Sequence, residues 1–285
     1  MRALVVGTSI ALVAWLALVP LGFLLWQSVH APAGGAEATQ LTVEHYRAAY
    51  SSRETARLLG NSLQFAAGAA LVAFTLGTLL AFVNERTDTP FKRLFFALSL
   101  VPLVIPGVLF VVAWMLLGSP RIGLVNVALR TLFGTDSVFV NVYTLPGMAL
   151  VDGLHYSPMA FLMMSAAFRT MDPALEEAAL ASGASLRTVF VQITFRLAWP
   201  AAFATLLILF VRALESFEVP ALLGLPGGIP VLTSAIYAAV HRYPGDVGLA
   251  SAYAVALLAI TSAGLWFQSR LLATCLPAGS PRPRE

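Results

Sequence analysis

The chain has 285 residues, of which 59% are hydrophobic and only 11% are charged, and its mean hydropathy is +0.83. A soluble domain carries about 25% charged residues, so this composition excludes a soluble globule and indicates an integral membrane protein. The net charge of +3 comes from basic residues scattered singly over the loops, a distribution that argues against nucleic acid as a partner.

Six apolar stretches are long enough to cross a bilayer as helices, which takes about 20 residues each. Their apolar residues are continuous rather than alternating, and this pattern excludes a β-barrel and favours helices. We therefore predict an all-α integral membrane fold with six transmembrane helices, at about residues 3–26, 59–83, 94–117, 145–168, 197–223 and 247–267.

The first apolar stretch could be read as a signal peptide, but it is longer than the usual apolar region of about 7–15 residues. Ala31 and Ala33 are compatible with a cleavage site, so removal of this stretch is the alternative. We divide the chain into a first helix with an extracytoplasmic loop (1–58), a membrane domain (59–272) and a Pro- and Gly-rich tail (273–285) that is expected to be disordered. The LTVEHYRAAY segment in that loop predicts a short helix suited to the membrane interface.

The Lys and Arg residues predict the orientation, because cytoplasmic loops carry an excess of them. With both termini in the cytoplasm, ten of the 17 basic residues lie on the cytoplasmic side and six on the other, and Arg212 lies inside a span. Arg86, Lys92 and Arg93 are expected to act as plain topological anchors. This orientation places the segment 172–196 in the cytoplasm.

That segment predicts a helical hairpin between the fourth and fifth spans. Asp172 can cap a helix whose first residue is Pro173. Gly183 is a natural stop for this helix, and Ser185 can cap a second helix that runs into the fifth span. Two capped helices are unusual for a passing loop, and they indicate a structured element.

Charged residues also occur inside the fifth span, in FVRALESFEVPALLG. Arg212, Glu215 and Glu218 recur at three-residue steps, which predicts one helical stripe. A charge at membrane depth costs about 2.5–3.5 kcal/mol and normally faces a bundle interior or an aqueous cavity. We predict that this stripe lines a translocation pathway; the alternative is a structural Arg212–Glu215 pair. Pro220 and the GLPGGIP segment after it are expected to break the helix and form a re-entrant or gating loop.

Enzymatic signatures are missing from the sequence. It has no G-x-x-x-x-G-K-[ST] phosphate loop and no H-E-x-x-H motif, so we assign the chain no catalytic residue, metal ligand or cofactor of its own. Its single cysteine, Cys275, excludes a Cys-rich metal site. An intramembrane enzyme centred on Asp152 and His155, or a channel or receptor without an ATPase, is the alternative from a different class.

The hairpin carries a series of residues in a fixed order: Glu177, Ala178, Ala179, Gly183, Ala184 and Ile193. This series resembles the EAA loop of binding-protein-dependent ABC permeases. The sequence departs from the family pattern at Ser182, where the family often has Asp, and at Phe195-Arg196, where it usually has Leu-Pro. The resemblance implies that the loop docks on an ATPase subunit, with Glu177 as a charge partner and Gly183 making the turn.

The same resemblance implies an architecture and a set of partners. The fold would be the six-helix transmembrane domain of a type I ABC importer in the bacterial inner membrane. Substrate would arrive on an extracytoplasmic binding protein and cross between two permease halves, while an ATPase dimer binds and hydrolyses ATP.

The LESFEVPALLG wording is similar to the iron(III) branch of these permeases. Members of that branch commonly fuse two six-span halves, and this sequence matches the first half. The second half would then come from a homodimer or from a separate chain. Permeases for polyamine, thiamine, sulfate or phosphonate share the loop and the topology, so these substrates stay open as alternatives.

Overall fold

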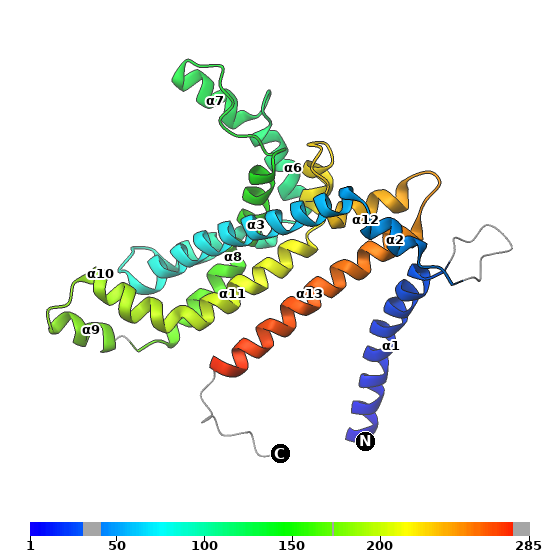
Figure 1. Cartoon of the computed structure of the whole chain (residues 1–285). Coiled ribbons are helices and arrows are strands. Elements are labelled where there is room, and N and C mark those ends of the chain that lie inside the picture. Colours follow the sequence, from blue (N-terminus) through cyan, green and yellow to red (C-terminus); the bar gives the residue numbers. More distant parts are fainter. Residues whose placement is uncertain (31–40, 173, 276–285) are drawn as a thin grey trace. The chain divides into compact units, whose positions relative to one another are not determined.

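The computed structural model describes residues 1–30, 41–172 and 174–275, and helices account for most of them (Figure 1). The chain forms two compact units: unit 1 comprises Met1–Ser62 and Pro230–Ile260, and unit 2 comprises Leu63–Ile229 and Thr261–Glu285. The candidate cleavage site at Ala31 and Ala33, Pro173, and the tail from residue 276 lie outside the described residues.

Unit 1 contains three complete helices and the first parts of two long ones. These are α1 (Arg2–Ser28), α2 (Glu44–Tyr50), α12 (Leu232–His241) and the beginnings of α3 (Arg53–Arg86) and α13 (Val247–Cys275). Its buried core lies among α2, α3, α12 and α13, at Ala49, Leu58, Leu232, Ala252 and Tyr253. The apolar side chains of α1 are exposed instead, as expected of a helix that faces lipid.

Helix α2 confirms the short helix expected in the first loop, and one of its faces is covered by protein. His45 is buried, with Nε2 at 3.0 Å from the carbonyl oxygen of His30. The Tyr50 hydroxyl donates to the carbonyl of Ala252 at 3.0 Å. Burial and two neighbouring tyrosines raise the pKa of Tyr50, so the hydroxyl keeps its proton and remains a donor at neutral pH.

In unit 2, α8 (Leu145–Thr170) and α11 (Phe195–Glu215) lie side by side along α3 (Figure 1). One buried cluster joins the three helices, formed by Ala81, Phe161, Met164, Phe168, Ala198 and Ala202. Small residues allow the backbones to approach closely. At Gly77 and Gly153 on this interface a side chain would overlap backbone atoms of the neighbouring helix, so only glycine fits there.

Within the part of the chain that the structure describes, four helices are long and apolar enough to cross a membrane, or five if the bent pair formed by Lys92–Val104 and Gly107–Gly118 counts as one span. The predicted number of six is reached only if α8 is added. Helix α8 has 26 residues and thus the necessary length. Asp152, His155 and Ser157 lie in its middle and lower its hydropathy.

The predicted third span is interrupted rather than merely kinked. It is divided into α4 (Lys92–Ser99), α5 (Val101–Val104) and α6 (Gly107–Gly118), and the chain bends by 98° at the last break. Ile105 is extended there, with φ −77° and ψ 126°. Pro106 explains the break, because proline lacks an N–H group and disfavours helical geometry in the residue before it.

After α6, residues 119–144 form a long loop that contains the helix α7 (Leu124–Phe133); we call this segment the excursion. Its centre is Asn126, which is fully buried. The Asn126 amide group donates to the carbonyls of Ser119 (2.9 Å) and Val140 (2.7 Å), and its oxygen accepts from the N–H groups of Phe139 and Val140 (both 2.9 Å). One side chain therefore ties the two ends of the excursion together.

Asn126→Ala should open this excursion. The substitution removes four hydrogen bonds and leaves buried backbone groups unsatisfied, at a cost of roughly 2–4 kcal/mol in the free energy of unfolding. Thermal or SDS unfolding of the purified chain in detergent measures this loss. Thr131→Val is the matched control, because the Thr131 hydroxyl bonds only within α7; equal stability of the two variants would contradict the prediction.

Candidate functional site

The hairpin predicted over residues 172–196 is present, and Asp172 caps its first helix as predicted. Its first helix is α9 (Ala174–Ala181), and the N–H of Ala174 donates to Oδ1 of Asp172 at 2.9 Å. Asp172 therefore caps α9 by satisfying one of the free N–H groups at its start.

The turn of the hairpin depends on Gly183. Its φ is +84°, a left-handed conformation that favours glycine. The N–H of Gly183 donates to the carbonyl of Leu180 (3.0 Å) and that of Ala184 donates to the carbonyl of Ala179 (3.1 Å), which closes the end of α9. A Cβ at position 183 would have no heavy atom within 4 Å, so backbone conformation alone requires glycine here.

The second half of the hairpin passes into the fifth span without a loop. Ser185 accepts from the N–H of Thr188 at 3.2 Å and so caps α10 (Leu186–Val189). A π-helical turn (Phe190–Thr194) follows and leads directly into α11. The sequence has Phe195-Arg196 where the related loops have Leu-Pro, and here the helix continues.

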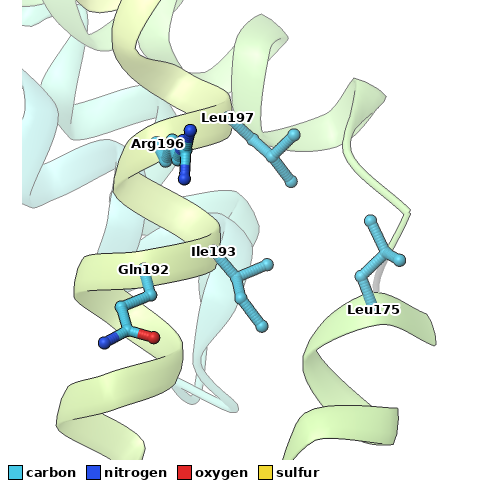
Figure 2. Close-up of a pocket in the computed structure, with 5 residues that line it drawn as sticks. All are labelled: Leu175, Gln192, Ile193, Arg196 and Leu197. Carbon is cyan, nitrogen blue, oxygen red and sulfur yellow. The ribbon is translucent and has the colours of Figure 1, made fainter.

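An open pocket of about 460 Å³ lies between α9 on one side and the π-helical turn and the beginning of α11 on the other. Figure 2 shows Ile193 and Leu197 pointing across it toward Leu175, while Gln192 and Arg196 also line it. Of the residues singled out in the sequence, Ile193 thus faces the pocket, whereas Glu177 and Ala178 are exposed on α9.

The sequence analysis missed a group of polar contacts that holds the hairpin to the other helices. The Arg86 guanidinium donates to the carbonyls of Phe168 (2.8 Å) and Met171 (3.3 Å), and its Nη1 lies 3.5 Å from Oε2 of Glu176. The Thr194 hydroxyl donates to the other Glu176 oxygen at 2.8 Å. Arg86 therefore does more than anchor the topology, and Glu176 rather than Glu177 is the carboxylate bound within the chain.

The charged residues of the fifth span are arranged differently from the predicted stripe. Arg212 and Glu215 form an ion pair at 3.6 Å near the end of α11. The helix ends at Glu215 and Ser216 is extended (ψ 133°), so Glu218 does not continue that helical face. The predicted single stripe of three residues was wrong. The cause is Pro220, whose ring clashes with the carbonyl four residues earlier, at Ser216, and therefore breaks the helix before the proline.

Helix α8 contributes a second set of polar groups at this break. Asp152 is buried, and its Oδ1 accepts from the Ser216 hydroxyl at 2.7 Å while its Oδ2 has no hydrogen-bond partner. Both Asp152 and His155 lie within electrostatic reach of Glu218. The Glu218 carboxyl in turn lies against Gly107, the first residue of α6, where a Cβ would come within 3.3 Å of it.

The structure thus brings together two groups that the sequence analysis treated as rival hypotheses. The Arg212 guanidinium lies over the ring of Tyr156, 5.6 Å from its centroid. We call the combined set the charged cluster; its members are Asp152, His155, Tyr156, Arg212, Glu215 and Glu218. The cluster contains three carboxyl groups and one guanidinium, and Glu215 is the carboxylate that is ion-paired with Arg212. Helix α6 meets the turn that follows the break in α11 beside Glu218.

This geometry does not form the acid–base pair that an intramembrane enzyme would need. Nδ1 of His155 has no hydrogen-bond partner, and its ring is held 4.9 Å from the ring of Phe110 and 5.3 Å from that of Tyr156. Among the described residues, no three His, Cys, Asp or Glu side chains are placed to hold a metal ion. Charged groups at helix breaks inside a bundle are typical of transporters.

The apolar spans and the charged side chains at their breaks therefore define the chain as a membrane permease. The chain belongs to the family of binding-protein-dependent transport system inner membrane components, whose model matches residues 73–273. This match includes the whole hairpin and the charged cluster.

Relatives in this family have several substrates in their names. The ferric transport system permease protein FbpB of Actinobacillus pleuropneumoniae is 31% identical over 187 residues, which cover 64% of this chain and 26% of that protein. The molybdenum transport system permease protein ModB of Escherichia coli K12 is 29% identical over 192 residues, 66% of this chain and 81% of ModB. The chain spans about a quarter of the length of the ferric relatives that it matches.

A solved structure has the same fold at low sequence identity. A bacterial ABC transporter involved in the import of the acidic polysaccharide alginate aligns with a TM-score of 0.78 and 19% identity, over 96% of this chain and 96% of its own. The alignment supports the fold alone. It covers nearly the whole chain.

Ser216→Ala should destabilise the charged cluster. The substitution removes the hydroxyl that Asp152 accepts from and leaves a buried carboxyl group without its partner, at roughly 1–3 kcal/mol. Unfolding of the purified chain in detergent measures the effect. Ser99→Ala is the control, since that hydroxyl bonds only to a carbonyl of its own helix; if both variants unfold alike, the Asp152–Ser216 contact has no stabilising role.

Proposed function

We propose that the chain is the permease subunit of an ATP-driven ABC importer of the bacterial inner membrane and that the hairpin 172–196 receives the force. A separate ATPase dimer would bind and hydrolyse the ATP, and this chain would need no cofactor of its own. The observation that carries the proposal is the capped hairpin that continues into α11 without a loop. A stiff element can transmit movement to a membrane helix, which alternating access requires.

The residues proposed to contact the ATPase lie along the hairpin: Glu177, Ala178, Ala179, Gly183, Ala184 and Ile193. The exposure of Glu177 supports a role as charge partner, because Glu176 is already paired inside the chain. The other proposed partners are a second permease half, an extracytoplasmic binding protein and membrane lipid. The charge count predicts that both termini and the hairpin face the cytoplasm.

We propose that Arg212, Glu215 and Glu218 line the translocation pathway, as part of the charged cluster, and that the substrate is iron(III). Glu215 neutralises Arg212 at 3.6 Å, so the carboxylate of Glu218 leaves an excess of negative charge. Such a site attracts a cation. The ferric relative supports the same choice. Polyamine and thiamine are cations and remain alternatives on this ground.

An oxyanion is the second candidate, and the ModB relative favours it because the chain covers 81% of that protein. Arg212 is about half exposed and carries the only positive charge of the charged cluster. Molybdate, sulfate and phosphonate all belong to this class. The excess of negative charge argues against it.

The ATPase interaction is tested by two substitutions at Gly183. Asparagine adopts the left-handed conformation more readily than a β-branched residue does. Gly183→Asn should therefore retain the co-purifying ATPase and its hydrolysis, whereas Gly183→Val should lose both although it inserts normally. The proposal would be overturned if both variants retained the ATPase, or if no ATPase co-purified with the wild-type chain. Co-purification from the membrane followed by an ATP hydrolysis assay gives the answer.

Substrate class is tested at Glu218. With iron(III) as substrate, Glu218→Gln should reduce uptake of radioactive iron by the assembled importer about tenfold, since a carboxylate at membrane depth acts in a low dielectric. Glu44→Gln, exposed on α2, is the matched control. Uptake of molybdate in place of iron, with a loss in Arg212→Gln and none in Glu218→Gln, would favour the oxyanion instead.

A further inference from the structure

Arg86 is the last residue of α3, and its side chain closes the end of α8. Its Nη2 donates to the carbonyls of Phe168 and Met171, which belong to the last turn and the cap of that helix. Terminal carbonyls lack partners within their own helix and carry partial negative charge, so a guanidinium is a suitable cap. The Arg86 side chain is only 10% exposed.

Glu176 connects this cap to the hairpin and to the fifth span. One carboxylate oxygen faces Arg86 at 3.5 Å, and the other accepts from the hydroxyl of the buried Thr194 at 2.8 Å. Thr194 is the last residue of the π-helical turn before α11. Through three side chains, α3, α8, α9 and the start of α11 are thus joined at one place.

The contact between Glu176 and Thr194 spans a gap that apolar packing does not close. Their sequence neighbours Leu175 and Ile193 line the pocket between α9 and α11, where Leu175 is half exposed (Figure 2). A π-helical turn also interrupts the regular hydrogen-bonding pattern of an α-helix. Without the hydrogen bond, α9 could move into the pocket or deform the turn, and α11 would stay in place.

We propose that Arg86, Glu176 and Thr194 form a clasp that transmits movement of the hairpin to α3 and α8 as well as to α11. The three residues are positioning residues: they fix the angle between α9 and the helices without touching substrate or nucleotide. The inference rests on the proposed function, because it assumes that an ATPase moves the hairpin.

A neighbouring ion pair offers a matched control. Arg169 at the end of α8 donates to both oxygens of Glu85 on α3, each at 2.9 Å, so it joins these helices without reaching α9. Its side chain is 57% exposed, so solvent and salt screen this pair more than they screen the contacts of Arg86, which is 10% exposed. Arg169→Gln removes a charge close to the clasp but leaves all three of its residues in place.

The experiment compares Thr194→Val with Thr194→Ser in the full chain assembled with its ATPase in nanodiscs. Valine keeps the size and the branched Cβ of threonine but has no hydroxyl, whereas serine lacks the methyl group but keeps a hydroxyl for Glu176. Three quantities are measured: the amount of assembled complex, basal ATP hydrolysis, and the increase in hydrolysis when iron(III)-loaded binding protein is added.

Thr194→Val should assemble normally and keep basal hydrolysis, while the stimulation by binding protein falls about fivefold or more, as expected for loss of a hydrogen bond to a charged group. Thr194→Ser and Arg169→Gln should resemble the wild type. Equal stimulation in the valine and serine variants would overturn the clasp. Poor assembly of the valine variant alone would also overturn it, because Thr194 would then be merely structural. A wild-type chain that retains no ATPase would instead refute the proposed function.

Discussion

A membrane provides no hydrogen-bonding partner for a helix that stops inside it, and unit 2 is organised around how its interrupted helices are satisfied. Pro220 ends α11 at Glu215, and Ser216, the residue after it, donates its hydroxyl to Asp152 of α8. Pro106 interrupts the third span so that α6 begins at Gly107, beside the carboxyl of Glu218. Two proline breaks therefore gather polar side chains that lipid would otherwise exclude.

The hairpin differs from these breaks, because nearly all the contacts that fix its conformation join residues close together in the sequence. Asp172 and Ser185 cap its helices and Gly183 closes the turn through two backbone hydrogen bonds. The stiffness of the element comes from these short-range contacts. Its attachment to the membrane helices, in contrast, is made by Arg86 and Glu176, which lie 90 positions apart in the sequence.

Membership of the family does not by itself identify the substrate of this protein. Relatives named for ferric, molybdenum and diacetylchitobiose transport all match the chain at 26–31% identity. The alginate importer shares the fold at 19%. Relatives with one architecture thus carry the names of chemically different substrates, so the substrate proposed for this chain rests on the side chains of the charged cluster and not on the fold.

The sequence by itself determined the membrane class, the helical hairpin and its caps, because these depend on composition and on residues within a few positions of one another. It also located Arg212, Glu215 and Glu218, but not their arrangement, since the stripe required an unbroken helix. Only the tertiary structure joined Asp152 to Ser216, 64 residues apart, and Arg86 to Phe168, 82 residues apart. Pairings at such separations leave no local periodicity, because the packing of α3, α8 and α11 brings these residues together.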